Sequence, residues 1–215
     1  MNTHQAEGSR RGTIISYMLR IVLALLLIVA IVERDWVYIF ACSISIMISF
    51  IPTILKRDYH ITLPWVFELL IATALFLHIG GGVLKAYHLI PGYDILTHFV
   101  SSILVSFLAF AVIYILDEYW DGLNMDIYAM AFVVVIFTMA MGVVWEFLEW
   151  SVDLVFGTTE QLGLHDTMRD LLVDTTGGLI MAVVGVKLIK SGKFKQLLTD
   201  LGKQVYWSII RRDSS

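Results

Sequence analysis

The sequence predicts an all-α integral membrane protein that forms a bundle of about six transmembrane helices. Of its 215 residues, 58% are hydrophobic and only 16% are charged, against about 25% charged in soluble proteins. The mean hydropathy is +0.79, and several windows stay apolar over about 20 residues, the length that crosses a hydrocarbon core. Because lipid offers backbone groups no water to bond, each window is expected to form a helix.

The first three spans are expected near residues 14–32, 36–55 and 64–84. Polar residues 1–13 come before them, and the first span lacks the small-residue cleavage site of a signal peptide, so we expect it to remain as a helix. The only cysteine, Cys42, lies in an apolar run. A single cysteine excludes an intrachain disulfide and a thiolate metal site.

The last three spans are expected near residues 94–116, 127–150 and 169–189, and the turn at Pro91 precedes the first of them. Residues 151–168 are too few and too polar to cross the membrane twice. We therefore expect them to form an outer loop that can fold back over the end of the bundle.

A basic tail is expected to follow a single six-helix domain of residues 1–192. Residues 193–215 are predicted to lie in the cytoplasm as an amphipathic helix held at the membrane surface by anionic lipid. A solvated basic tail is the alternative. Apolar residues recur there at helical intervals between basic ones: Phe194, Leu197, Leu198, Leu201, Val205 and Ile209.

The basic residues predict which side of the membrane each helix end faces. An even number of spans places both termini on one side, and basic residues concentrate on the cytoplasmic side. Of the 15 Lys and Arg residues, only Arg34, Lys85 and Arg169 fall on the side opposite the termini. We therefore expect both termini in the cytoplasm and the start of the fourth span at the outer leaflet.

Ten ionisable side chains lie at the predicted outer end of the last three spans. An ionisable group at membrane depth costs about 2.5 to 3.5 kcal/mol on insertion scales, and such groups are functional-site candidates. Those nearest the loop, such as Asp153 and Asp166, are expected to face water. The ten are Asp94, His98, Glu146, Glu149, Asp153, His165, Asp166, Arg169, Asp170 and Asp174.

Helical spacing directs many of these side chains toward one shared space, because residues three or four apart share a helix face. Crowded carboxylates repel one another unless a cation neutralises them. The ions Mg²⁺, Ca²⁺ and Mn²⁺ favour carboxylate oxygens, and imidazole suits Zn²⁺ or Mn²⁺. We therefore predict a divalent metal site with the ligands Asp94, His98, Glu146, Glu149, Asp170 and Asp174.

Three basic side chains at the same predicted level are candidates for substrate binding. Arg169 can pair with a neighbouring acid or hold a phosphate group through two hydrogen bonds. Lys85 and His88 lie at the outer mouth, where they can attract an anionic headgroup or only extend to the interface.

Three sequence patterns resemble the YjdF-like family of membrane proteins and, more distantly, the VanZ-like proteins. They are YDILTHF at 93–99, WEFLEW at 145–150 and DLLVDTTGG at 170–178. The VanZ-like pattern has Asp then His on one helix, Glu on the next, and Asp followed by Asn and Gly on the last. The resemblance implies site positions at Asp94, His98, Glu146 or Glu149, Asp170 and Gly177. Asp174 stands where that pattern has Asn, which adds a negative charge.

These features predict a multi-pass protein of the cell membrane whose outward-facing site binds a divalent metal and binds or acts on a lipid or cell-envelope phosphate headgroup. As an enzyme it would be a metal-dependent hydrolase or transferase. The ion would polarise the phosphoryl oxygen, and the predicted catalytic residues are His98, Glu146 and Asp170, with His98 as general base or acid. There is no HExxH or Walker A motif. Nucleic acid is not an expected partner, and the oligomeric state stays open.

Two other function classes remain open. An ion-coupled or proton-coupled carrier would use the acids and histidines as a relay, but it needs polar groups across the membrane, and the inner halves of the last three spans are nearly all apolar. A non-catalytic scaffold or sensor would hold the same residues as a buried network of ion pairs.

Overall fold

The computed structural model describes residues 3–58, 63–119 and 124–198, with side chains from residue 14 onward. These ranges are helical and contain no strand. Six of their helical segments are long and apolar enough to cross a membrane, which confirms the all-α membrane class and the number of spans. The segments are Ile14–Glu33, Trp36–Asp58, Trp65–Val83, Tyr93–Glu118, Ile127–Phe156 and Leu164–Lys190.

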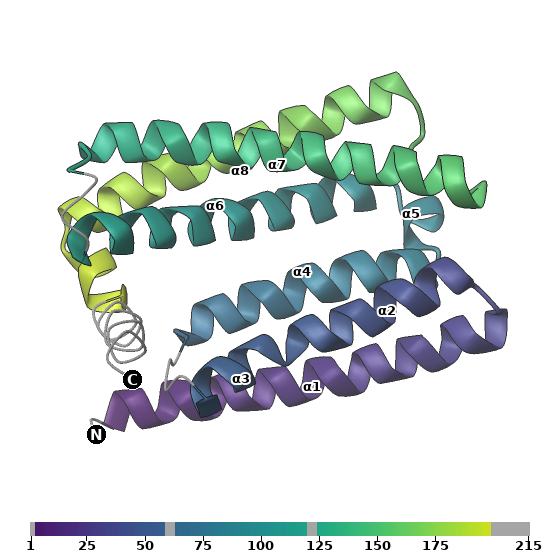
Figure 1. Cartoon of the computed structure of the whole chain (residues 1–215), viewed down its shortest axis with the longest axis horizontal. Helices are drawn as coiled ribbons and strands as arrows, with labels where there is room; N and C mark the ends of the chain where they lie inside the picture. Colours follow the sequence, from purple (N-terminus) through teal and green to yellow (C-terminus); the bar gives the residue numbers. More distant parts are fainter. Residues whose placement is uncertain (1–2, 59–62, 120–123, 199–215) are drawn as a thin grey trace, which may run out of the picture. The chain divides into compact units, whose positions relative to one another are not determined.

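The helices divide into two compact units. The first extends to Pro91 and holds α1 (Thr3–Glu33), α2 (Trp36–Ser49), α3 (Ile51–Asp58), α4 (Trp65–Val83) and α5 (Ala86–Leu89) (Figure 1). The second, Gly92–Lys195, holds α6 (Tyr93–Tyr119), α7 (Ile127–Phe156) and α8 (Leu164–Lys190). One domain over residues 1–192 stays a prediction, as does the cytoplasmic location of both termini.

In the first unit, α1, α2 and α4 pack around a small apolar core. Leu19, Leu23 and Leu26 lie on one face of α1 because they are three or four residues apart. Cys42 of α2 is buried among them as a free thiol, in agreement with the sequence analysis. The second span is interrupted between α2 and α3, where Pro52 in the first turn of α3 has no backbone N–H to donate.

In the second unit, glycines of α8 allow close packing of three long helices. A Cβ atom at Gly177 would lie 2.9 Å from the Cβ of Ser102 on α6, and one at Gly178 would lie 3.3 Å from the Cβ of Thr138 on α7. Small residues permit such approach in membranes, where association depends on van der Waals packing. Gly177 and Gly178 therefore let α8 approach α6 and α7 closely.

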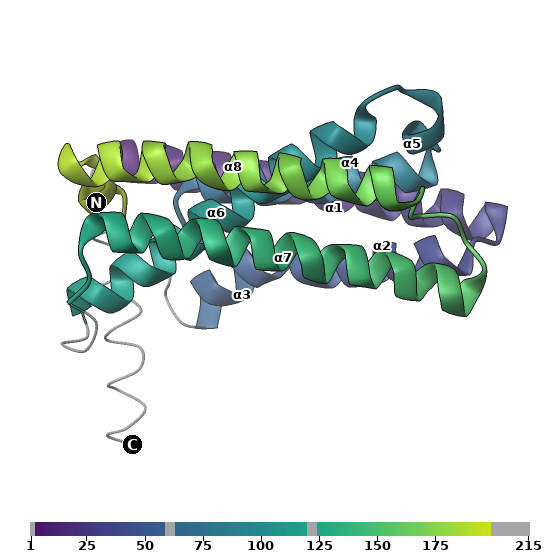
Figure 2. The ribbon, with the colours of Figure 1, turned by 90° about the horizontal axis from the view of Figure 1, so that it is seen from above.

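The last two spans extend further than predicted. Helix α7 continues to Phe156 and α8 begins at Leu164, so the connection comprises only residues 157–163 instead of 151–168 (Figure 2). The polar composition of this stretch indicated a loop, but no residue before Gly157 breaks the helix. Gly157 has a φ of 67° and ends α7 in the left-handed conformation that glycine favours.

The start of the predicted tail is packed against α6. Residues 193–198 are helical, and the fully buried ring of Phe194 meets the rings of Phe107, Phe110 and Tyr114 at centroid distances of 6.1, 5.8 and 5.3 Å. The remainder of the predicted interfacial helix, residues 199–215, lies outside the described residues.

Candidate metal centre

Three helices of the second unit bring the six predicted ligands together. Asp94 and His98 lie in the first two turns of α6, whereas the four other acids come from the interiors of α7 and α8. Helix α7 extends ten residues past Glu146, or about 15 Å, so this acid lies well inside the bundle. Four of the six side chains are almost fully buried: His98, Glu146, Asp170 and Asp174 are 6%, 4%, 2% and 5% exposed.

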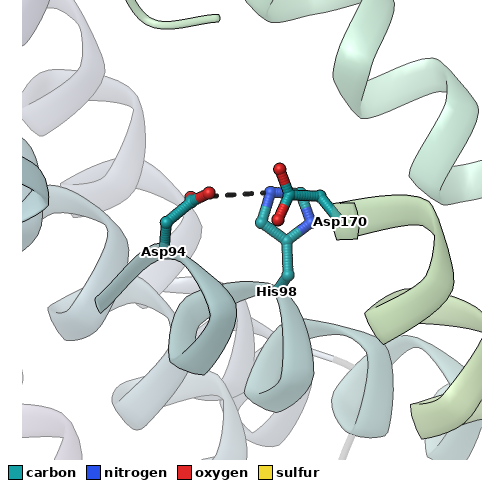
Figure 3. A group of neighbouring side chains, drawn as sticks. All are labelled: Asp94, His98 and Asp170. Atoms are coloured by element: carbon teal, nitrogen blue, oxygen red, sulfur yellow. Dashed lines mark ion pairs between the residues drawn. The ribbon is translucent and has the colours of Figure 1, made fainter. Parts of the chain in front are cut away.

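His98 lies at the centre of the cluster and faces an acid with each ring nitrogen. Its Nδ1 is 3.3 Å from both carboxylate oxygens of Asp174 on α8. Its Nε2 is 3.8 Å from Oδ1 of Asp94, which is an electrostatic contact rather than a hydrogen bond. The side chains of Asp94, His98 and Asp170 point toward one another (Figure 3).

Two groups of side chains in the cluster have the spacing of metal ligands. Asp94, His98 and Asp170 can each offer one ligand atom such that all three atoms lie within 4.8 Å of one another, and the same is true of His98 with Glu146 and Glu149. The groups share His98, and neither includes Asp174. The side chains that helical spacing places on one face of each helix therefore meet at the His98 imidazole.

Two buried acid oxygens of the cluster have no hydrogen-bond partner in the described part of the protein. They are Oε1 of Glu146 and Oδ1 of Asp170. A buried polar atom without a partner costs about 1 to 3 kcal/mol, and more when it is charged. Such an atom in a native structure is commonly explained by a water molecule or an ion.

Arg169 is the cation that approaches these acids from α8. Its Nη2 donates to Asp166, and the same atom lies 3.6 Å from Oδ2 of Asp94. Its Nε lies 3.7 Å from Oδ1 of Asp170. The Arg169 side chain remains 40% exposed. Asp166 is therefore paired with Arg169 and does not simply face water.

The cluster carries more negative than positive groups. Two like unit charges 4.8 Å apart repel by about 3 kcal/mol at an effective dielectric constant of about 20. One guanidinium and one imidazole therefore leave most of the repulsion uncompensated, so that protons or a cation must neutralise part of the charge. The carboxyl groups concerned are Asp94, Glu146, Glu149, Asp166, Asp170 and Asp174.

Two donors beside the cluster do not follow from the sequence analysis. The Nε1 of Trp145 donates to Oε1 of Glu149 at 2.8 Å. The amide of Gln161 donates to Thr167 at 3.0 Å and lies 3.5 Å from Oε2 of Glu146. The four-residue spacing of Trp145 and Glu149 is visible in the sequence, but nothing in it indicates where the loop carries Gln161.

Lys85 and His88 belong to the first unit, where Lys85 directly precedes α5, His88 lies within it, and both are exposed. Their prediction as substrate-binding residues therefore stays a prediction. His165 is exposed in the first turn of α8 and is therefore part of a helix rather than of a loop.

Asp153, which we expected to face water, instead holds the loop between α7 and α8. Its carboxylate accepts hydrogen bonds from the Thr158 hydroxyl at 2.6 Å and from the backbone N–H groups of Glu160 and Gln161 at 2.7 and 2.9 Å. Asp153→Ala is expected to lower the local free energy of opening by about 2 kcal/mol, because these bonds to a charged acceptor are lost. Hydrogen exchange of the two amides would measure this. Unchanged exchange would contradict the assigned role.

Comparison with known sequences places this chain in a family. A family model described as a predicted membrane protein (DUF2238) matches residues 14–191. The chain belongs to this family. An uncharacterised protein of Thermotoga maritima is 30% identical over 148 residues, which are 68% of this chain and 74% of that protein. No solved structure matches. The family and the six apolar helices together establish a multi-pass membrane protein.

Proposed function

We propose that the cluster around His98 binds a divalent cation, and that this ion is the functional centre of the protein. The observation that carries the proposal is the pair of buried oxygens, one on Glu146 and one on Asp170, that accept no hydrogen bond in the described residues. Each of these residues belongs to one of the two ligand groups, and both groups include His98. A cation would supply the missing partners and neutralise the excess negative charge in one step.

The two ring nitrogens of His98 favour different roles for the acids that lie beside them. A metal-binding histidine usually donates its second ring N–H to a carboxylate, which fixes the ring. Asp174 lies against Nδ1 of His98 and suits this orienting role better than the predicted role of ligand. The Nε2 atom, on the side of Asp94, is then the ligand atom.

The separations of the ligand atoms accommodate several ions. Two ligands of one ion lie no further apart than twice the metal–ligand distance, which is about 4.6 to 5.2 Å for Ca²⁺ and about 4 Å for Mg²⁺ or Zn²⁺. The atoms of both groups lie within 4.8 Å of one another. Binding of Ca²⁺ therefore requires little movement of the ligand atoms, and binding of the smaller ions requires a shift of at most about 1 Å. The imidazole, in contrast, favours Zn²⁺ or Mn²⁺.

We further propose a phosphate-bearing lipid or envelope compound as the substrate. The exposed part of Arg169 can contact a phosphate oxygen beside the ion, because a guanidinium binds phosphate through two N–H groups. In a hydrolase or transferase the ion would polarise the phosphoryl oxygen and activate a water molecule. Since both ring nitrogens of His98 would be occupied, by the ion and by Asp174, the proton would pass to a carboxylate oxygen that does not bind the ion, with Oε2 of Glu146 the first candidate.

We also propose that the site is arranged as in the YjdF-like and VanZ-like proteins, which the sequence resembles. The matched positions Asp94, His98 and Asp170 form one of the two ligand groups. Gly177, the last matched position, allows α8 to approach α6 at Ser102. Both observations support a shared arrangement of the site, with the additional charge of Asp174 serving to orient His98.

A proton-coupled carrier is the second candidate, and one observation favours it. The hydroxyls of Ser106 and Thr138 lie 2.9 Å apart near the middle of α6 and α7, and Ser106 donates to the carbonyl of Ser102 at 2.5 Å. A polar route therefore extends inward from the cluster. It meets the fully buried side chains of Phe110 and Val134, so the route does not cross the unit.

Metal analysis of the purified protein separates these functions. After incubation with Mg²⁺, Mn²⁺, Zn²⁺ and Ca²⁺ and removal of excess ions, the wild type is expected to retain about one divalent ion per chain. Glu146→Gln and Asp170→Asn are expected to retain less than about a tenth of that. The matched control is Asp126→Asn, which removes one carboxylate of the same unit but keeps an equivalent helix cap on α7.

Failure to retain any of the four ions in the wild type would overturn the metal proposal. A proton flux in liposomes that Ser106→Ala abolishes would then support the carrier. The proposed phosphate-bearing substrate is tested separately, by measuring phosphate release from lipid mixtures with and without the retained ion. Ion retention without phosphate release would leave a metal-binding protein and reject the enzyme.

A further inference from the structure

The first unit contains a polar cavity that has no part in the metal centre. Its volume is about 150 Å³, and its wall includes Arg20 of α1, Lys56 of α3 and Glu68 of α4, together with the hydroxyls of Ser16 and Thr53. Pockets for drug-sized ligands are usually about 300 to 1,000 Å³. The cavity therefore suits a small polar group such as a lipid headgroup.

Arg20 is held in place at this cavity. Its Nη2 donates to the Ser49 carbonyl at 3.0 Å and to the Thr53 hydroxyl at 2.5 Å, and its guanidinium lies 4.1 Å from the centre of the Phe50 ring. Its Nε is buried and has no hydrogen-bond partner in the described residues. The guanidinium is thus fixed in position, and its buried Nε–H is left to donate.

The charges on the cavity wall are mixed. Two basic side chains, Arg20 and Lys56, face one acid, Glu68, whose Oε2 accepts a hydrogen bond from the Ser16 hydroxyl at 3.3 Å. A bare phosphate would be attracted by the first two and repelled by the third. A group that carries a phosphate and an amine would satisfy all three charges.

An apolar groove of about 250 Å³ lies between α1 and α4, two of the helices that line the cavity. Its wall includes Ile15 and Val22 of α1 and Ala72 and Phe76 of α4. Ile15 is adjacent to Ser16, and Ala72 lies about one turn beyond Glu68. The groove therefore lies at about the level of the cavity on α1 and nearer the middle of the span on α4, where a hydrocarbon chain would lie.

We propose that the cavity and groove together bind one phospholipid whose headgroup carries an amine, of the phosphoethanolamine type. The phosphate accepts hydrogen bonds from Nε of Arg20 and from Lys56, the ammonium group pairs with Glu68, and one acyl chain occupies the groove between α1 and α4. The groove supports a lipid over free phosphate, and Glu68 supports an amine-bearing headgroup over a purely anionic one.

The test measures lipid-dependent thermal stabilisation of the full chain in detergent. Short-chain phosphatidylethanolamine is compared with phosphatidylglycerol and with inorganic phosphate. The wild type should bind the ethanolamine lipid most tightly, and Arg20→Gln and Lys56→Gln should each weaken that binding at least about tenfold. Glu68→Gln should bind the two lipids with equal affinity, and its affinity for phosphatidylglycerol should be no lower than that of the wild type. Replacement of a purely structural residue would not produce this change of selectivity.

Lys187→Gln on α8 is the matched control, since it removes one exposed positive charge from the second unit. It should bind the lipids as the wild type does. Because Arg20 also contacts the break between α2 and α3, Lys56→Gln keeps the test valid if Arg20→Gln fails to fold. Equal effects of lipid and inorganic phosphate would overturn the proposal in favour of a free anion. Equal lipid binding by wild type, Lys56→Gln and Glu68→Gln would overturn it altogether.

Discussion

In excess chelator, Asp170→Asn is expected to unfold at a higher temperature than the wild type, and saturating divalent ion is expected to reverse that order. Asp170 is 2% exposed, and its Oδ1 has no hydrogen-bond partner in the described residues. Without an ion, replacement of this carboxylate by an amide removes like-charge repulsion and the burial of a charged oxygen that accepts no hydrogen bond within the described ranges. We expect a gain of about 1 to 3 kcal/mol, reduced by the loss of the 3.7 Å contact with Arg169.

With ion present, the wild type gains stability that the variant cannot. A ligand that binds only the folded state contributes about 2.7 kcal/mol at a concentration of 100 Kd. Thermal unfolding in detergent, with chelator and then with each of the four candidate ions, measures both halves of this prediction. Asp126→Asn serves again as control and should follow the wild type in both conditions.

The reversal separates a metal site from a structural network. If the acids only paired with Arg169 and His98, Asp170→Asn would be less stable than the wild type with or without ion. That result would contradict the proposed function and support the scaffold.

Gly142→Ala is expected to disturb the metal centre without changing any of its polar residues. A Cβ atom at Gly142 on α7 would collide with Oδ2 of Asp174 and would lie 3.2 Å from the Cβ and Cγ of that residue. Asp174 must then move, and His98 loses the carboxylate that orients its ring. Overpacking of this kind costs about 1 to 3 kcal/mol, and loss of the orienting group lowers metal affinity about 10- to 100-fold.

Gly178→Ala is the matched control for this change. It adds the same methyl group between α8 and α7, but its nearest contacts are with Thr138 at 3.3 to 3.6 Å. A small shift of that side chain can accommodate it, so metal affinity should stay near that of the wild type. Metal titration and thermal unfolding of both variants provide the measurement. Equal metal affinity of Gly142→Ala and the wild type would show that Asp174 does not position His98.

The membrane class and the order of the spans could be predicted from the sequence because hydropathy over about 20 residues is a local property. Helix ends were predicted less well. The polar residues before Gly157 indicated a loop, yet they remain helical, since polarity alone does not end a helix and the first residue able to do so is Gly157.

The site residues were also visible in the sequence, since a repeat of three or four residues places acids on one helix face. The angles at which the polar faces of the three helices meet are not a local property of any one helix. Only the packing of α6, α7 and α8 decides that His98 contacts Asp174 with one nitrogen and approaches Asp94 with the other. The same packing leaves oxygens of Glu146 and Asp170 buried without partners in the described residues.

The sequence by itself therefore determined that acids and a histidine lie together at one end of the last three spans, because composition and periodicity specify each helix separately. The tertiary structure decided which acid orients His98, which oxygens lack a partner, and that Arg20, Lys56 and Glu68 line a second polar cavity. These relations join residues far apart in the chain. Those of the metal centre depend on the close approach of helices at positions such as Gly142 and Gly177, which no property of a single helix fixes.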